Sequence, residues 1–463
     1  MKTKKIEVLA PAGNPAALKA AVFAGADAVY MGGSLFSARA SAVNFSREEM
    51  REAVLFARER NVRVYVTVNT LLKDDELPEA LDFCKFLCSV PVDGILIQDM
   101  GLFNILREAC PEMPLHASTQ MSLHTPGGAA LLKELGASRV VLAREMSLKE
   151  IEEVSKKTDV ELEAFVHGAL CMSLSGQCYF SAMLGGRSGN RGRCAQTCRL
   201  PFAAPGGTGH DLSLKDMSFI DHIETLHNAG VCSAKIEGRM KNPDYVFNVV
   251  RVWRRALDML RDGTWDADAV PTLERELGRS FNRGFTDAYL RGRSGAELMS
   301  FERAINQGVR VGRLVAVGHE EVTVELDAAV AAGDTLEIRF YPGVDARPDV
   351  PKRWPQVPCP VDAAAGEHIV VHCKRKVDAG CEVYLIRSAG VLDQTAAVLE
   401  RMRAEADAIA PVARAVEVLP FEGVAVDGGA STELVECAVP TRMVFAWQLM
   451  DADPRGELDL SDA

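Results

Sequence analysis

Four cysteines lie close together in a glycine- and arginine-rich stretch of the chain. They are Cys171, Cys178, Cys194 and Cys198, with six, fifteen and three residues between successive members. A free cysteine that only fills a core behaves as a small hydrophobic residue, and that role does not explain four thiols within 28 residues of polar sequence. Thiolates are nucleophiles and metal ligands. The pattern therefore predicts a metal, cluster or redox site.

Three kinds of chemistry are compatible with these thiols. Structural zinc usually takes ligand pairs about two to four residues apart, and only Cys194 and Cys198 fit that spacing. Disulfides would conflict with a reducing compartment. An iron–sulfur cluster accepts looser spacings because its irons lie at separate corners, and thiolates are its usual ligands. The residues alone favour a cluster and leave zinc and other roles open.

Arginine is concentrated beside the thiols. Residues 187–199 contain four arginines and no acidic residue, although the whole chain has a net charge of −12. Residues 421–463 contain nine acidic and two basic side chains, a net charge of −7, which leaves −5 for the other 420 residues. The total charge argues against a uniformly basic nucleic-acid binder. The local stretch instead predicts a solvated loop, the neutralisation of a cluster, or a phosphate or RNA contact. The four arginines are Arg187, Arg191, Arg193 and Arg199.

The elements that must position these residues follow a repeating pattern. Short apolar runs alternate with amphipathic helical stretches, which is typical of β-α units around a parallel sheet. Eight such runs occur, the number in a TIM barrel. A doubly wound sheet does not need eight units, and no G-x-G-x-x-G motif follows the first run. The sequence thus predicts a TIM (β/α)8 barrel over residues 1–305, with the cysteines in an insertion at 168–215. The runs lie at 6–13, 27–33, 63–70, 93–99, 115–120, 139–145, 162–168 and 233–239.

Active sites of this fold collect at the carboxyl ends of the strands. Polar residues that end strands are often only helix caps, but several at one mouth are candidates for chemistry. Arg144, Lys235 and Arg239 have the charge to hold a carboxylate or a phosphate. The full set is Asn69, Gln98, Asp99, Ser118, Gln120, Arg144, Glu145, His167, Lys235, Glu237 and Arg239.

After residue 305 the hydrophobic period changes from helical to alternating. Five alternating segments separated by Gly, Asp and Pro predict a small antiparallel β-barrel over residues 306–390. Residues 391–463 are expected to form a helix at 393–410 and then an acidic tail.

Composition limits the class of protein. Apolar residues make up 48% of the chain and charged residues 25%, as in globular proteins. No apolar run reaches the ~18 residues of a membrane span, and no uninterrupted apolar segment follows the N-terminal lysines. We therefore expect a cytoplasmic protein without a membrane partner. The cysteines outside the cluster, including Cys84, Cys88 and Cys110, are expected to be packing residues.

The segment EAFVHGALCMSLSGQCYFS, residues 163–181, resembles the signature of the peptidase U32 family, the collagenase-like proteins. It departs from that signature at Phe180, where a smaller aliphatic residue is expected. The stretches NRGRCAQTCRLPF, KIEGRMKNPDYV and FNRGFTDAYL resemble further landmarks of the family. The resemblance covers roughly residues 5–390.

The resemblance implies one of two activities. Some members are described as peptidases. Others are cluster-dependent hydroxylases that make 5-hydroxyuridine in tRNA or 5-hydroxycytidine in 23S rRNA, and these RNA-directed members depend on prephenate. A further pair acts in ubiquinone synthesis.

Carried onto this chain, the hydroxylase interpretation assigns a role to each candidate residue. The four cysteines would hold a [4Fe–4S] cluster fed by an electron donor. His167, Lys235 and Glu237 would be catalytic, and Arg144 and Arg239 would bind prephenate. The four arginines of residues 187–199 would guide rRNA or tRNA.

Peptide hydrolysis needs a nucleophile with a base, a metal-bound water or paired carboxylates. The sequence contains no H-E-x-x-H and no G-x-S-x-G motif, and its nine histidines are scattered. We therefore expect a hydroxylase that modifies a pyrimidine base, with a U32-type peptidase as the alternative. A non-catalytic RNA-binding protein is a third class.

Overall fold

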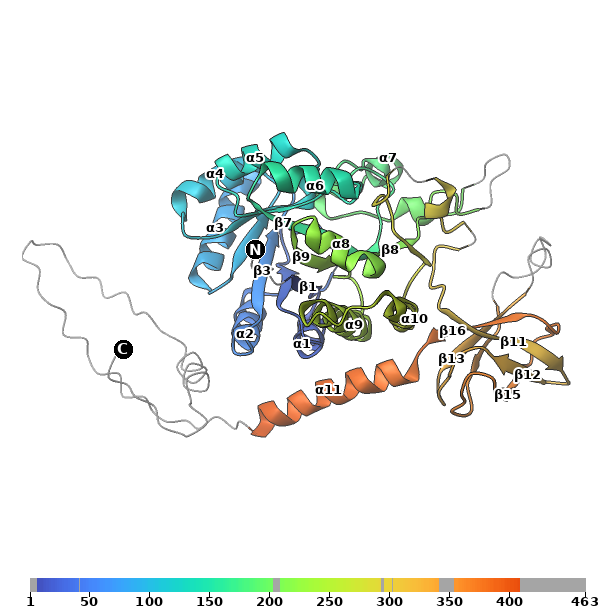
Figure 1. The fold of residues 1–463 in the computed structure, drawn as a ribbon. Helices are drawn as coiled ribbons and strands as arrows, with labels where there is room; N and C mark the ends of the chain where they lie inside the picture. Colours follow the sequence, from blue (N-terminus) through green and yellow to red (C-terminus); the bar gives the residue numbers. More distant parts are fainter. Residues whose placement is uncertain are drawn as a thin grey trace, which may run out of the picture.

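The computed structural model describes residues 6–40, 42–202, 209–292, 295–301, 303–340 and 354–408. Its centre is a closed barrel of eight parallel strands surrounded by helices (Figure 1). Neighbouring strands pair in sequence order, and β9 closes the ring by pairing with both β1 and β7. This confirms the predicted TIM barrel, and each predicted apolar run overlaps one strand. The strands are β1 (Glu7–Pro11), β2 (Ala28–Gly32), β3 (Arg63–Val68), β4 (Gly94–Ile97), β5 (Leu115–Ala117), β6 (Arg139–Val141), β7 (Glu161–Ala169) and β9 (Val231–Ile236).

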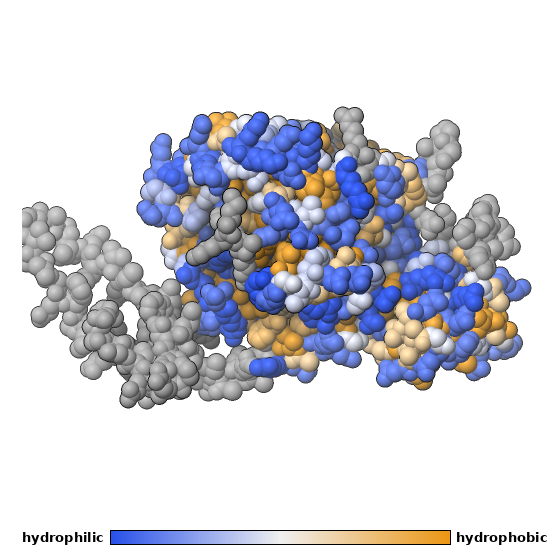
Figure 2. All heavy atoms as spheres, in the orientation of Figure 1, coloured by the Kyte–Doolittle hydropathy of each residue, from blue (hydrophilic) through white to orange (hydrophobic). Residues whose placement is uncertain are grey.

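Five of the nine outer helices of the described residues (α1, α2, α4, α5 and α6) begin at a side chain that accepts a hydrogen bond from a free backbone N–H. Ser46 and Ser147 each form a capping box with the glutamate three residues later, Glu49 and Glu150. The helices bury one face against the strands, and much of the opposite face in Figure 2 is hydrophilic. They are α1 (Pro15–Phe23), α2 (Arg47–Arg58), α3 (Leu77–Ser89), α4 (Met100–Ala109), α5 (Pro126–Glu134), α6 (Leu148–Lys157), α8 (Ile223–Asn228), α9 (Pro243–Arg261) and α10 (Val270–Gly278).

The insertion between β7 and β9 contains little regular structure. Its elements are the helix α7 (Phe180–Gly185), two single 3-10 turns at Gly189–Arg191 and Thr197–Arg199, and the short strand β8 (Asp216–Ser218). β8 runs antiparallel to the end of β7, with Ala169 opposite Asp216. A second short strand, β10 (Phe285–Thr286), adds to the other side of β8. The insertion therefore returns to the mouth of the barrel.

A separate six-stranded antiparallel sheet follows the barrel, curved into a half-barrel with a core of its own. The predicted antiparallel sheet is confirmed, and each of the five expected segments contains a strand. The sequence pattern did not predict β14, which is only three residues long. The strands are β11 (Val309–Val317), β12 (Glu321–Leu326), β13 (Thr335–Arg339), β14 (Gln356–Pro358), β15 (His368–His372) and β16 (Glu382–Arg387).

Helix α11 (Ala389–Ala408) leaves the last strand of this sheet and returns along the barrel. It lies against α1 and α9, as Figure 1 shows, and Val398 packs against the barrel core. The helix predicted at 393–410 is thus present, and it joins the sheet back to the barrel. The predicted acidic tail lies outside the described residues.

In the part of the chain that the structure describes, no helix has the length and apolar character needed to cross a membrane.

One cysteine differs from the packing prediction, whereas Cys110 packs against the barrel core as expected. Cys84 is buried as expected, but Cys88 is exposed and Cys110 is only half-buried. Cys88 lies one helical turn closer to the end of α3, where the helix emerges from its neighbours. The Sγ atoms of Cys88 and Cys110 lie 2.6 Å apart. The packing interpretation was therefore wrong for Cys88.

Charged side chains fill part of the barrel interior. Arg139 Nη1 lies 2.8 Å from a carboxylate oxygen of Glu7 and 3.2 Å from one of Glu163, and Lys235 Nζ lies 2.7 Å from the other oxygen of Glu163. All four side chains are at most 4% exposed. Such a network is stable only while every member keeps its partner, because an unpaired buried charge is costly.

We expect Arg139→Met to lower the free energy of unfolding by about 3–5 kcal/mol, because it leaves Glu7 and part of Glu163 without their buried cation. The measurement is urea unfolding monitored by circular dichroism. Arg47→Met is the matched control. Its ion pair with Asp82 is 43% and 64% exposed, so that change should cost about 1 kcal/mol or less. Equal effects of the two substitutions would contradict a stabilising role for the interior network.

Candidate functional site

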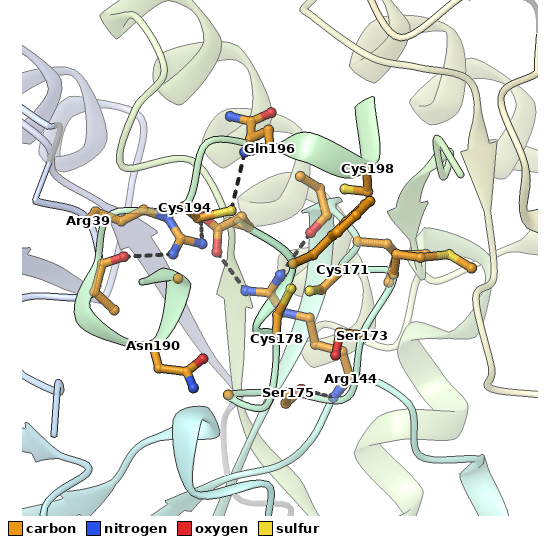
Figure 3. Close-up of a pocket in the computed structure, with 18 of the residues that line it drawn as sticks. Arg39, Arg144, Cys171, Ser173, Ser175, Cys178, Asn190, Cys194, Gln196 and Cys198 are labelled. Atoms are coloured by element: carbon orange, nitrogen blue, oxygen red, sulfur yellow. Dashed lines mark hydrogen bonds and ion pairs between the residues drawn. The ribbon is translucent and has the colours of Figure 1, made fainter. Parts of the chain in front are cut away.

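A cavity of about 640 Å³ opens at the carboxyl end of the barrel strands. The insertion forms most of its wall. Short segments after β2, β5, β6 and β9 complete it, through Arg39, Gln120, Arg144 and Glu237. All four cysteines of the insertion line this cavity, and Figure 3 shows them around one space. The barrel mouth and the thiol cluster are therefore one site.

The four thiols come from four different local structures. Cys171 follows β7, Cys178 precedes α7, Cys194 lies between the two 3-10 turns and Cys198 lies within the second turn. All are free thiols; Cys171 and Cys194 are exposed, and Cys178 and Cys198 are half-buried. Burial raises the pKa of Cys198, and the adjacent Arg199 opposes that rise. Within the described residues, no three His, Cys, Asp or Glu side chains lie so that they could hold a single metal ion.

Glycines let the insertion pack closely onto the barrel loops. Gly176 and Gly192 both have positive φ angles, of 76° and 75°, which side chains rarely adopt. A Cβ at Gly176 would overlap the backbone of Gln120, and one at Gly192 would overlap the carbonyl oxygen of Ser37. These contacts fix the insertion against the segments after β5 and β2, and so place the thiols over the mouth.

Backbone and hydroxyl groups surround Cys194. The N–H of Gln196 donates to Cys194 Sγ at 3.3 Å. The Ser181 hydroxyl accepts from the N–H of Ala195 at 3.0 Å and lies 3.9 Å from the same sulfur. These contacts hold the Cys194 sulfur in place at the cavity wall.

A carboxylate lies between two arginines on one side of the cavity. Arg144 Nη2 lies 2.7 Å from one oxygen of Glu237, and Arg39 Nη2 lies 3.2 Å from the other (Figure 3). Burial alone would raise the pKa of Glu237, but the two guanidinium groups outweigh it and lower this pKa to about 2. Glu237 is therefore a fixed negative charge near neutral pH and cannot donate a proton there.

Three further cations line another part of the cavity: Arg199, Lys241 and Arg283. Arg283 Nη1 lies 3.0 Å from the buried carboxylate of Asp216 in β8. Arg199 donates to the Ser213 hydroxyl at 2.9 Å and to the carbonyl oxygen of Leu170 at 3.2 Å. Lys241 Nζ lies 3.1 Å from the centre of the Phe281 ring.

Eight of the eleven residues predicted at the mouth do not line the cavity: Asn69, Gln98, Asp99, Ser118, Glu145, His167, Lys235 and Arg239. The last three were given roles in the reaction. His167 is 1% exposed and packs against Phe285 and against Trp253 of α9. Lys235 lies in the barrel interior, bound to Glu163. Arg239 is buried, and its guanidinium donates to Ser37, Thr67 and Asn44 at 2.6–2.9 Å. Arg239 therefore ties the segment that follows β2 to the end of β3.

The predicted RNA-binding arginines divide into two groups. Arg187 and Arg193 are exposed, and neither forms an ion pair with another described residue. Arg191 is anchored by an ion pair with Glu76 and a hydrogen bond to the carbonyl oxygen of Leu71. Arg199 lies at the cavity wall. Only the first two project from the insertion.

Sequence reasoning did not single out Arg39, Lys241 or Arg283. Arg39 lies seven residues beyond the end of β2, and Lys241 lies five beyond the end of β9, so a search limited to strand ends passed over both. The sequence did contain a signal for Lys241 and Arg283, because they lie within the stretches KIEGRMKNPDYV and FNRGFTDAYL.

Comparison with known protein families identifies the family of the chain. Residues 13–300 match the model of peptidase family U32. The chain belongs to this family. It is 38% identical over 355 residues to the 23S rRNA 5-hydroxycytidine synthase of Escherichia coli, across 73% of this chain and 53% of that protein. The match thus spans about half the length of that relative.

Two more relatives carry different names. A tRNA hydroxylation protein of Bacillus subtilis is 37% identical over 312 residues, across 65% of this chain and 74% of that protein. A protein of Porphyromonas gingivalis named collagenase is 33% identical over 313 residues, across 63% and 75% of the two chains. Family membership by itself does not separate RNA hydroxylation from proteolysis.

The burial of His167 predicts a pH dependence of stability. Burial lowers its pKa from 6.5 to about 3, so between these values the unfolded chain binds a proton that the folded chain does not. The contribution of His167 to the free energy of unfolding is fully present above about pH 6.5. On acidification below that value this contribution falls by up to about 1.4 kcal/mol per pH unit. Urea unfolding at several pH values should show a shallower slope for His167→Gln than for the wild type. His368→Gln, at an exposed position, should keep the wild-type slope. If both variants keep it, His167 does not remain neutral in the folded protein.

Proposed function

We propose that the protein is an RNA hydroxylase that holds a [4Fe–4S] cluster on Cys171, Cys178, Cys194 and Cys198. Its product would be 5-hydroxycytidine in 23S rRNA or 5-hydroxyuridine in tRNA. The observation that carries the proposal is that four free thiols from one insertion line a single cavity at the mouth of a TIM barrel. The names of two relatives point in the same direction.

The donor set fits a cluster. All-thiolate ligation is typical of iron–sulfur centres. The thiols are spread around a cavity and do not converge on one ion, which suits ligands bound to separate irons. Cations next to the sulfurs would offset the negative charge of the thiolates, and Arg39 and Arg199 occupy such positions beside Cys194 and Cys198. When bound, the cluster would provide a route for electrons from a donor protein or reductant.

The other residues of the cavity would bind and orient the substrate. Arg39 and Arg144 keep Glu237 ionised, so this carboxylate accepts hydrogen bonds and cannot act as an acid. The volume of about 640 Å³ lies within the ~300–1,000 Å³ range of small-molecule sites and suits a nucleobase turned out of its stack.

Exposed side chains of the insertion suit an RNA substrate. The exposed Arg187 and Arg193 lie on the same insertion as the thiols, where they would bind phosphates of the RNA backbone. Tyr179 and Met183 are also exposed on this insertion, at 61% and 82%, and an exposed aromatic ring is a stacking platform for unpaired bases. The proposal includes prephenate as the small co-substrate.

The peptidase alternative rests on the names of two relatives, one called a collagenase and one an uncharacterized protease, and on the name of the family. No histidine lines the described cavity, and its single lining carboxylate is held between two arginines. This arrangement supplies neither a nucleophile–base pair nor paired carboxylates.

The cluster is tested by iron content and by nucleosides together. Protein purified without oxygen should contain about four irons and matching acid-labile sulfide per chain, and Cys178→Ala should lose most of both. Cys232→Ala, at a half-buried thiol outside the cavity, should keep them. In a deletion strain, mass spectrometry of digested rRNA and tRNA should show the loss of one 5-hydroxypyrimidine, which wild-type protein restores and Cys178→Ala does not.

Three results would contradict the proposal. A colourless protein with about one zinc and no iron would remove the cluster. Unchanged 5-hydroxycytidine and 5-hydroxyuridine in the deletion strain would remove the substrate. Cleavage of gelatin by pure protein, retained in Cys171→Ala, would favour the peptidase.

RNA binding through the insertion is tested by salt dependence. Arg187→Ala and Arg193→Ala should each weaken binding of a substrate RNA fragment and make the slope of log K against log salt shallower by about one unit or slightly less. Arg261→Ala removes an exposed arginine at the far end of α9 and should leave affinity and slope unchanged. Fluorescence anisotropy at several salt concentrations measures both quantities. Equal slopes in all four proteins would show that the RNA does not contact this insertion.

A further inference from the structure

We propose that Lys241 and Arg283 form a subsite that binds a carboxylate group of a small anionic co-substrate, with Arg199 adding positive charge beside them. The position of this subsite is inferred from the charges of the cavity. The identity of the anion, prephenate, rests on the proposed function. The assignment moves the anion away from Arg144 and Arg239, the residues that the sequence favoured.

The described cavity carries an excess of positive charge. Five of its lining residues are cationic and one, Glu237, is acidic. Glu237 is already shared by two of the cations. Asp216 pairs with Arg283, and no carboxylate of a described residue lies within ion-pair distance of Lys241. Buried or half-buried cations without carboxylate partners are costly, so this part of the site is suited to an anion.

Lys241 and Arg283 both lie against one aromatic ring. Lys241 Nζ lies 3.1 Å and Arg283 Cζ 4.7 Å from the centre of the Phe281 ring. The ring stabilises the ammonium group through its face but supplies no hydrogen-bond acceptor. Burial lowers the pKa of Lys241 to about 8, and a bound carboxylate would reverse that change.

The positive charge of Lys241 is not explained by the thiols. The charges that act on Lys241 are Asp216, Arg283, Glu237 and Arg199, and no cysteine is among them. Arg39, in contrast, interacts with Cys194, and Arg199 interacts with Cys198 and Cys171. A cluster would therefore be neutralised by Arg39 and Arg199, and the charge of Lys241 remains for another ligand.

Donor geometry favours a carboxylate over a single point charge. Arg283 uses Nε for the carbonyl oxygen of Ala304 and Nη1 for Asp216, which leaves Nη2 for a ligand. The ammonium of Lys241 has three donors and makes no hydrogen bond with a described residue. Two donors from neighbouring side chains match the two oxygens of one carboxylate.

Arg144 and Arg239, which the sequence favoured for binding the anion, already have partners within the protein. Arg239 is buried and donates to three side chains at its own site. Arg144 binds Glu237 and the carbonyl oxygen of Ala169. An anion at either residue would have to displace a partner that the fold supplies.

The test is calorimetric titration of anaerobically purified full-length protein with prephenate. Lys241→Met should weaken binding by about tenfold to a hundredfold, the effect of losing one charge-assisted hydrogen bond, and Lys241→Arg should restore most of it. Wild-type affinity should fall as the pH rises through about 8, because the free ammonium loses its proton there, and Lys241→Arg should lose that pH dependence. Lys156→Met, at an exposed lysine of α6, is the matched control. Iron content should be the same in all four proteins.

Parallel titrations distinguish the sources of the anion. Inorganic phosphate and a short RNA replace prephenate in two further series. Lys241-dependent binding of phosphate or RNA with no binding of prephenate would overturn the carboxylate assignment, as would wild-type prephenate affinity in Lys241→Met.

The subsite and the proposed function can fail separately. Lys241-dependent binding of prephenate in a protein that hydroxylates no RNA would uphold the subsite and remove the function. RNA hydroxylation together with prephenate binding that is unchanged in Lys241→Met would uphold the function and rule out the subsite.

Discussion

The antiparallel pairing of β8 with the end of β7 is the interaction on which the site depends. β7 carries the chain into the insertion, and β8 returns it to the same edge, so both ends of the thiol-bearing segment are fixed at the barrel mouth. Two glycines then allow the middle of the segment to rest on the loops after β2 and β5. Asp216 of β8 also binds Arg283, so the same short strand positions the thiols and part of the cationic wall.

The carboxylates inside the barrel and at its mouth are paired with cations, so a cation without a carboxylate partner differs from its surroundings. Inside the barrel, Glu7 and Glu163 are matched to Arg139 and Lys235, and at the mouth Glu237 is matched to two arginines. Burying charges is tolerated in this protein where each has a partner. Lys241 departs from that rule at the wall of a cavity, where a ligand can reach it. The contrast with the interior network identifies this cation as a binding group rather than a structural one.

The sequence predicted the TIM barrel, the small antiparallel β domain and the place of the four thiols, because these depend on hydrophobic period and residue spacing. It did not predict that the small domain is a half-barrel rather than a closed one. It could not predict which strand-end residues face the mouth. In β7, Glu163 points into the barrel, and alternation along the strand would send His167 the same way. A register irregularity between Phe165 and His167 instead accompanies a histidine packed against Trp253 of the helix layer. Arg39, Lys241 and Arg283 were missed because loop geometry, which has no period, brings them to the cavity.

The extent of the family match bears on the choice between hydroxylation and proteolysis. Every residue that lines the cavity lies between positions 38 and 283, inside the matched range 13–300, whereas the half-barrel begins after it. The chemistry of this chain is therefore carried by the barrel and its insertion.

Proteolysis at this cavity would require an activated nucleophile or a metal-bound water. The described wall has four thiols but no histidine to activate one of them, and its only lining carboxylate is neutralised on both oxygens. A thiol nucleophile would moreover use only one of the four thiols that line the cavity.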